Sequence, residues 1–158
     1  MILYLDASAL VKRYVSEFGS DMVNDATGEA DLVGTALISR AEASAAFAKA
    51  VRMGALKHAE GLKCLHAFRK DWRDLVRVQL TENAMSRADT FAWEHNLRGY
   101  DAVHLAAASL WQETMGDQVT MATFDQTLWE ATEKVGLVPF PADLPALLKE
   151  WKVTKGRK

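Results

Sequence analysis

The sequence of 158 residues contains a single cysteine, Cys64. An internal disulfide is therefore impossible, and the chain must fold through packing and hydrogen bonding alone. Because disulfides belong to oxidising compartments, this composition favours a reducing cytoplasm. The chain is long enough to bury a core of ordinary size within one domain.

Long apolar runs are also missing. The longest mainly apolar stretch, residues 102–111, is interrupted by His104 and Ser109 and is far shorter than the roughly 20 residues that span a bilayer. The N-terminus is apolar, but no positive charge precedes its apolar run and Asp6 interrupts it. These features argue against a signal peptide and against a membrane protein.

The chain has no large excess of charge of either sign, since its net charge is −2. A protein with this balance has no overall attraction for nucleic acid, so any such role must rest on local patches. Hydrophobic residues make up 49% of the chain and charged residues 25%, which is ordinary for a globular domain. The sequence contains no linker, internal repeat or low-complexity segment.

Short apolar segments alternate with helical patterns along the whole chain. The apolar segments predict strands at residues 2–5, 32–35, 75–80, 119–122 and 136–140. Helical spacing and cap signals predict helices at residues 7–14, 20–26, 39–53, 57–72, 81–96, 100–111, 126–134 and 144–151. Because such strands pair in parallel through right-handed crossovers, we expect an α/β fold with a mainly parallel, five-stranded sheet between helical layers.

Local patterns make more specific predictions about the helices. Ser39 and Glu42 match a capping box, in which each side chain bonds a free backbone N–H of the first turn. Gly99 suits a left-handed residue that ends a helix. The helices at 39–53 and 57–72 are expected to form an antiparallel pair that could serve as a lid or a dimer surface.

Four acidic residues occupy related positions in this pattern. Asp6 and Asp125 follow predicted strands, and Glu42 and Asp101 lie in the first turns of predicted helices. Strand ends and the following helix starts lie on the same edge of a parallel sheet, so the four carboxylates can converge in one crevice. The alternative is that they are helix caps or parts of caps, because Asp is a preferred cap residue and Glu42 fits the capping box.

Clustered carboxylates repel one another and therefore need a cation. At a separation of 4 Å and an effective dielectric constant of 20, each pair costs about 4 kcal/mol. A site made of oxygen ligands suits Mg²⁺ or Mn²⁺, whereas the lack of a Cys/His ligand set argues against zinc. The acids therefore predict a magnesium or manganese site.

The chain resembles a PIN domain, and among these the toxin nucleases of the VapC type from toxin–antitoxin pairs. The matching segments are residues 5–8, 39–42, 97–107 and 122–125, within a resemblance that covers about residues 1–140. The most distinctive of them is the run from Asp101 to His104. We accordingly expect a nuclease domain over residues 1–141, and a short helix with a basic tail over residues 142–158.

The resemblance implies metal-dependent hydrolysis of RNA, leaving a 5′-phosphate and a 3′-hydroxyl. It implies that Asp6, Glu42, Asp101 and Asp125 form the metal and catalytic set. Ser8 and Thr123 match hydroxyls that support the acids without being ligands. It further implies a PIN-like three-layer fold with the first strand central, a small antitoxin as protein partner, and a homodimer.

Other polar and aromatic residues have two interpretations each. Lys12, Arg13, Arg40 and Arg98 lie close to the acids in sequence and could bind RNA phosphates, or they could be solvated surface charges. His104 is expected to be a satisfied core histidine or one that supports a ligand, not a catalytic base. The five tryptophans are expected mainly to pack helices. The basic residues of the tail favour disorder over an RNA-binding arm: Lys149, Lys152, Lys155, Arg157 and Lys158.

Two other functions remain open from the sequence. One is a PIN module that binds RNA or protein without cleaving, which the complete set of acids disfavours. The other is a phosphotransferase that uses Asp6 as its nucleophile, in the manner of dehalogenase-like enzymes. Such enzymes carry a second Asp two residues later, where this chain has Ser8.

Overall fold

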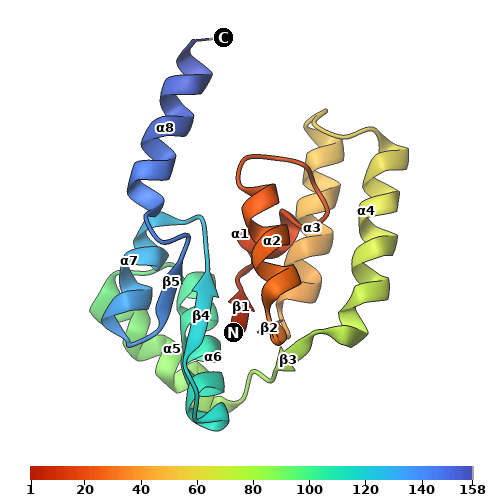
Figure 1. Ribbon diagram of the computed structural model, residues 1–158. Coiled ribbons are helices and arrows are strands. Elements are labelled where there is room, and N and C mark those ends of the chain that lie inside the picture. Colours follow the sequence, from red (N-terminus) through yellow and green to blue (C-terminus); the bar gives the residue numbers. More distant parts are fainter. Residues whose placement is uncertain (158) are drawn as a thin grey trace.

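The computed structural model describes residues 1–157 and is built on one parallel sheet (Figure 1). Its strands are β1 (Ile2–Leu5), β2 (Leu32–Ala36), β3 (Val76–Val78), β4 (Val119–Ala122) and β5 (Val138–Phe140). Their order is β3-β2-β1-β4-β5, and all neighbouring pairs are parallel. The predicted α/β class, five-stranded sheet and central first strand are confirmed.

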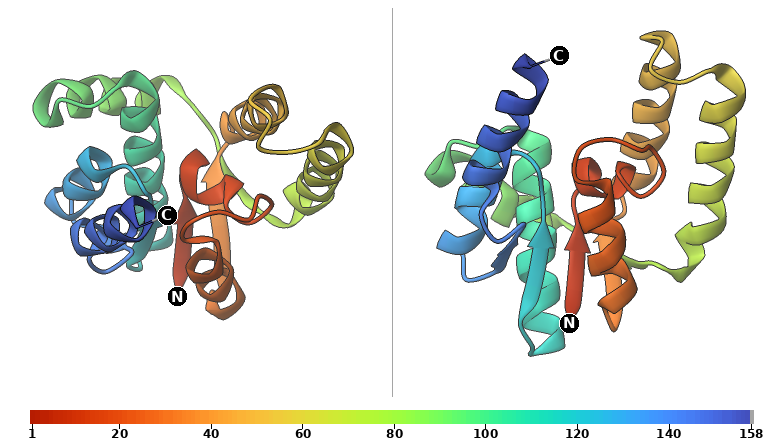
Figure 2. Two further views of the ribbon diagram at one scale, coloured as in Figure 1. Left: turned by 90° about the horizontal axis from the view of Figure 1, so that it is seen from above. Right: turned by 45° about the horizontal axis from the view of Figure 1, so that its top comes forward.

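Helices cover both faces of this sheet (Figure 2). On one face lie α5 (Glu82–His95), α6 (Gly99–Met115) and α7 (Gln126–Lys134), and on the other lie α1 (Ala7–Val11), α2 (Ser20–Glu29), α3 (Ser39–Arg52) and α4 (His58–Asp71). Strand β1 is buried on both faces because its side chains alternate between them. Ile2 and Tyr4 pack against the first group, and Leu3 and Leu5 against the second.

Helix α6 is the central helix of the first face, as its apolar sequence predicts, although it begins one residue earlier and ends four residues later than expected. Trp111 of α6 lies against Gly34 of β2 so closely that a Cβ at position 34 would be 2.7 Å from the indole ring. This contact lets α6 pack close to the sheet and thereby sets the position of its first turn relative to the strands.

Helices α3 and α4 form the predicted antiparallel pair, which continues into a short 3₁₀ turn, η1 (Trp72–Asp74) (Figure 1). Phe47 and Phe68 pack edge to face across the pair with their ring centroids 6.0 Å apart. Tyr14, which follows α1, packs against both rings. The aromatic cluster ties the base of the helical pair to the sheet, so α3 is positioned by packing rather than by its N-terminal cap.

Two of the predicted cap signals are wrong, and the helix predicted at residues 7–14 ends at Val11. The capping box does not form, because the Ser39 hydroxyl bonds the Thr35 hydroxyl at 2.6 Å and Glu42 bonds His104. Residue 38 is the N-cap instead and has helical backbone angles. Gly99 is the first residue of α6, and the left-handed residue that ends α5 is Asn96, with φ of 53°. Asn tolerates this conformation better than most residues do.

The C-terminal segment is more helical than expected. Helix α8 (Leu144–Gly156) includes most of the basic residues that were predicted to form a disordered tail, so that prediction is wrong for residues 152–156. Trp151 stacks on Phe18 with ring centroids 5.0 Å apart, which holds α8 beside the segment before α2. Lys158 lies outside the described residues. Within residues 1–157, no helix combines the length and apolar character needed to cross a bilayer.

Candidate active site

The four acidic residues lie on elements that end or begin at the carboxyl edge of the sheet. Strands β1 and β4 are parallel neighbours; Asp6 follows β1 directly, and Asp125 lies three residues after β4. Glu42 and Asp101 lie in the first turns of α3 and α6. The topology therefore gathers four acids, from four separate segments, at the edge where open α/β sheets bind ligands.

Asp6 is the most buried of the four, with 3% of its surface exposed. Its Oδ1 accepts hydrogen bonds from the Ala9 N–H at 2.8 Å and the Ser8 hydroxyl at 2.7 Å. The predicted capping role is thus real, but it occupies one oxygen only. Burial raises the pKa of Asp6, against the lowering effects of His104, Thr123 and these hydrogen bonds.

The two hydroxyls that were predicted to support the acids occupy suitable positions. Ser8 also accepts the Phe124 N–H at 3.1 Å, which joins the ends of β1 and β4 through one side chain. Thr123 is fully buried, and its hydroxyl accepts the Asp125 N–H at 3.2 Å. Ser8 thus contacts the Asp6 carboxylate and the backbone after β4, and Thr123 contacts the backbone N–H of Asp125.

Arg98 bridges Asp101 and Asp125. Its Nε donates to Asp101 Oδ2 at 2.9 Å, and its Nη2 donates to Asp125 Oδ2 at 3.3 Å. These two acids raise the pKa of Arg98. The other Asp125 oxygen caps α7 by accepting the Leu128 N–H. A fixed guanidinium charge therefore offsets part of the repulsion among the acids.

Glu42 is held by a buried histidine. His104 is 2% exposed, and its Nε2 lies 2.8 Å from Glu42 Oε1 while its Nδ1 lies 2.8 Å from the Tyr4 hydroxyl. The expectation that His104 is a satisfied histidine beside a candidate ligand agrees with these contacts. No pattern in the sequence pointed to Tyr4, because it is one apolar-facing residue of a buried strand.

The four carboxylates suit a hard cation, although their oxygens do not surround a common point in this structure. Among residues 1–157, no three His, Cys, Asp or Glu side chains are close enough together to ligate one ion as they stand. Each of Asp6, Glu42 and Asp101 nevertheless commits one carboxylate oxygen to the protein hydrogen bonds described above and has a second. Oxygen-only ligation of this kind fits Mg²⁺ or Mn²⁺.

The four predicted RNA-binding cations all make contacts within the protein. Lys12 is almost buried, bonds Glu17 at 2.9 Å and lies over the Phe124 ring. Arg13 lies 3.9 Å from Asp71, Arg40 lies over the Trp72 ring, and Arg98 bridges two acids. Trp93 is the clearest exception to the prediction that the tryptophans pack helices, since it is 90% exposed.

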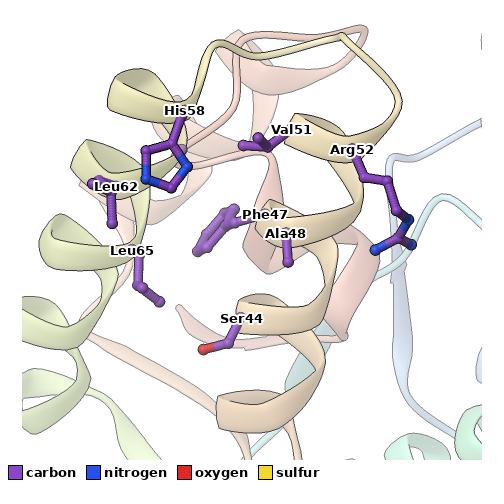
Figure 3. Close-up of a pocket in the computed structure, with 9 residues that line it drawn as sticks. Ser44, Phe47, Ala48, Val51, Arg52, His58, Leu62 and Leu65 are labelled. Atoms are coloured by element: carbon purple, nitrogen blue, oxygen red, sulfur yellow. The ribbon is translucent and has the colours of Figure 1, made fainter.

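Two of the hollows that α3 lines were not foreseen from the sequence. One is a groove of about 600 Å³ beside Glu42, lined also by Lys49, Arg52 and Tyr100. The other is an apolar hollow of about 320 Å³ between α3 and α4, where Leu62 and Leu65 face Phe47 and neighbouring α3 residues (Figure 3). Residues 45, 49 and 52 are three or four positions apart and so share one face of a helix, which is the sequence signal that could have indicated the first groove.

A five-stranded parallel sheet with its first strand central is the PIN-like fold that the motifs predicted. Two curated relatives from Mycobacterium tuberculosis, Ribonuclease VapC45 (strain CDC 1551) and Ribonuclease VapC49 (strain H37Rv), are each 32% identical over 90% of this chain and 97% of theirs. The chain belongs to the VapC family of ribonucleases. No family model matches it.

Solved structures share the fold. A protein of a toxin–antitoxin complex from Klebsiella pneumoniae superposes with a TM-score of 0.56 at 15% identity, over 79% of this chain and 87% of that one. PAE2754 from Pyrobaculum aerophilum superposes with a TM-score of 0.61 at 19% identity, over 94% and 90%. At these identities the likeness concerns the fold alone.

The raised pKa of Asp6 predicts how stability depends on pH without metal. The folded protein holds the Asp6 proton more tightly than the unfolded chain does, so stability is lost as pH rises through the folded pKa. Asp6→Asn removes this loss while keeping an acceptor for Ala9. In thermal melts with chelator, we expect the variant to melt above wild type at about pH 8 and the difference to shrink towards about pH 4.

Asp89→Asn is the control, because Asp89 is exposed on α5. Its melting temperature should follow that of wild type across the range. A constant difference between Asp6→Asn and wild type at all pH values would contradict the predicted cost of the buried charge.

Proposed function

We propose that this protein is a metal-dependent endoribonuclease and the toxin of a toxin–antitoxin pair. The observation that carries the proposal is the placement of four carboxylates, from four separate segments, at the carboxyl edge of the sheet. Two relatives of nearly full length carry the name ribonuclease. Structures of this fold include a protein of a toxin–antitoxin complex.

Asp6, Glu42 and Asp101 are the residues that would hold Mg²⁺ or Mn²⁺, with Asp125 as the fourth acid. When bound, the cation supplies an activated water and stabilises charge on the phosphate and the leaving oxygen. Ser8 and Thr123 hold Asp6 and Asp125 in place. Arg98 is a fixed positive charge beside Asp101 and Asp125, suited to neutralise a phosphate oxygen that approaches them.

The two alternatives have weaker support. A module that binds without cleaving would not need four acids at one edge, where their repulsion costs stability. A phosphotransferase would need Asp6 as an accessible nucleophile. Its 3% exposure and the hydrogen bonds to Ser8 and Ala9 disfavour that role.

Asp101→Asn is expected to reduce RNA cleavage by on the order of 100-fold or more, since one electrostatic group at the reacting centre typically contributes that much. Asn can still accept the hydrogen bond from Arg98, so the fold should be preserved. The measurement is cleavage of a structured RNA by purified protein with Mg²⁺ or Mn²⁺. Chelator should stop the wild-type reaction.

Asp89→Asn again serves as the matched control, because it removes the same charge from the exposed face of α5. It should cleave at the wild-type rate. Equal cleavage by Asp101→Asn and wild type would show that the activity comes from another site or from a contaminant.

The groove beside Glu42 is our proposed path for the RNA strand. Lys49 and Arg52 are exposed and have no ion pair among the described residues, unlike Lys12, Arg13 and Arg98. Tyr100 is 63% exposed, lines the same groove and precedes Asp101. Cations that neutralise phosphates beside an aromatic ring that stacks a base are the usual means of holding single-stranded nucleic acid.

Salt dependence separates the two kinds of contact. Lys49→Ala with Arg52→Ala should lower the slope of log affinity against log salt by about 1.4, at about 0.7 for each lost phosphate contact. Tyr100→Ala should leave the slope unchanged and cost about 1–3 kcal/mol of binding. Binding of a single-stranded RNA oligonucleotide is measured by fluorescence anisotropy with chelator present, so that no cleavage occurs.

Lys63→Ala with Arg69→Ala is the control for the double variant. Both residues are exposed on α4, outside the groove. If the control lowers the slope as much as the double variant does, the effect is one of net charge and the groove is not the path.

We propose that the apolar hollow between α3 and α4 is the binding site for an antitoxin segment (Figure 3). Its walls are the side chains of Phe47, Val51, Leu62 and Leu65, so it suits apolar residues of an amphipathic helix. It lies across α3 from the groove beside Glu42, and Arg52 lines both. A partner seated there would stand next to the RNA path.

Leu62→Glu should disrupt this contact, because it would bury an unpaired charge. We expect the variant to lose co-purification with the product of a small reading frame next to the gene, and to arrest growth even when that product is expressed. Lys63→Glu, one residue along on α4 and outside the hollow, should behave as wild type. Normal co-purification of Leu62→Glu would place the partner elsewhere.

We further propose that residues 1–141 form the nuclease domain and that α8 is an added helix. A homodimer and a cytoplasmic location would follow the pattern of a toxin that acts on cellular RNA.

A further inference from the structure

Tyr4 and His104 form a buried hydrogen-bonded pair that has no role in the proposed reaction as described so far. Tyr4 is fully buried on β1, and His104 is 2% exposed on α6. The ring of His104 lies between the Tyr4 hydroxyl and Glu42 Oε1, with 2.8 Å on each side. Three elements, β1, α6 and α3, are joined by two hydrogen bonds.

The hydrogen-bonding capacities of Glu42, His104 and Tyr4 determine which group donates in each of the two hydrogen bonds. An ionised carboxylate only accepts hydrogen bonds, so His104 Nε2 must carry the proton that points to Glu42. In the neutral imidazole, Nδ1 is then an acceptor and the Tyr4 hydroxyl is its donor. Tyr4 thereby selects the tautomer of His104 that donates to Glu42.

We infer that Tyr4 and His104 are positioning residues, which fix Oε1 of Glu42 and leave Oε2 to bind the divalent cation. The inference rests on the proposed function, since it assigns a role at that site. Residues that orient a ligating carboxylate through hydrogen bonds commonly affect metal affinity 10- to 100-fold. Both side chains are buried and act through Glu42, so neither is a catalytic residue.

A core histidine that only fills space would have different consequences. Tyr4 also packs against the His104 and Trp111 rings, with centroids 5.9 and 6.4 Å away, and Tyr4→Phe keeps this packing. Only the hydroxyl is lost, and with it the constraint on the tautomer. If packing were the whole role, Tyr4→Phe would leave the affinity for metal unchanged.

The test measures Mn²⁺ affinity by isothermal titration, without RNA. Tyr4→Phe should bind Mn²⁺ about 10- to 100-fold more weakly than wild type. Its cleavage should recover at raised Mn²⁺ concentration, because the defect lies in affinity. Tyr14→Phe is the matched control, since Tyr14 also donates to a carboxylate, Asp71, but away from the site.

A second pair of variants keeps the test decisive if Tyr4→Phe folds poorly. Gln and Met are of similar size, but only Gln can accept from Tyr4 and donate to Glu42. His104→Gln should retain Mn²⁺ affinity within a few-fold of wild type, and His104→Met should show the 10- to 100-fold loss.

Two results would overturn the inference. Wild-type affinity in Tyr4→Phe, or equal affinities in the Gln and Met variants, would show that the hydrogen-bonded pair is structural only, while the proposed function would stand. A wild-type protein that neither binds Mn²⁺ nor cleaves RNA would instead overturn the proposed function, and this inference with it.

Discussion

Four carboxylates lie at one edge of the sheet and repel one another, and the polar contacts around them offset that repulsion. Water cannot screen it fully, because Asp6 is buried and burial raises its pKa. Hydrogen-bond donors around the acids offset this repulsion: backbone N–H groups, the Ser8 hydroxyl, Arg98 and His104. Each donates to a defined carboxylate oxygen, so each acid is oriented before any cation binds.

That assembly follows from the position of β1. As the central strand it has parallel neighbours on both sides, which brings the ends of β1 and β4 together and places α3 beside them. Its alternating side chains also serve both layers: Leu3 and Leu5 pack against one helical layer, while Tyr4 reaches His104 on the other. The same four residues thus build the core and support the site.

Helix α3 connects the site to two surfaces. Its first turn carries Glu42, one side continues into the groove with Lys49 and Arg52, and another side faces the apolar hollow shared with α4. Its alanines leave room on both sides, since Ala45 and Ala46 line the groove and Ala48 lines the hollow. A partner bound in the hollow would therefore contact the same helix that carries Glu42 and lines the groove.

Local patterns were enough to predict the strand and helix order, the parallel sheet and the four acids, because alternating apolar segments and strand-end acids can be recognised from neighbouring residues alone. It also determined the caps at Asp6 and Asp125, whose side chains bond backbone three residues away. The hydrogen-bond partners of Ser39, Glu42 and His104 depend instead on how the elements pack, since these partners lie on other elements. Likewise, Lys12, Arg13 and Arg40 lie close in sequence to Asp6 or Glu42, yet packing determines which residues they contact. The cations that line the groove are instead Lys49 and Arg52. Hydrogen bonds between distant segments depend on how the helices pack against the sheet, and no local pattern encodes that.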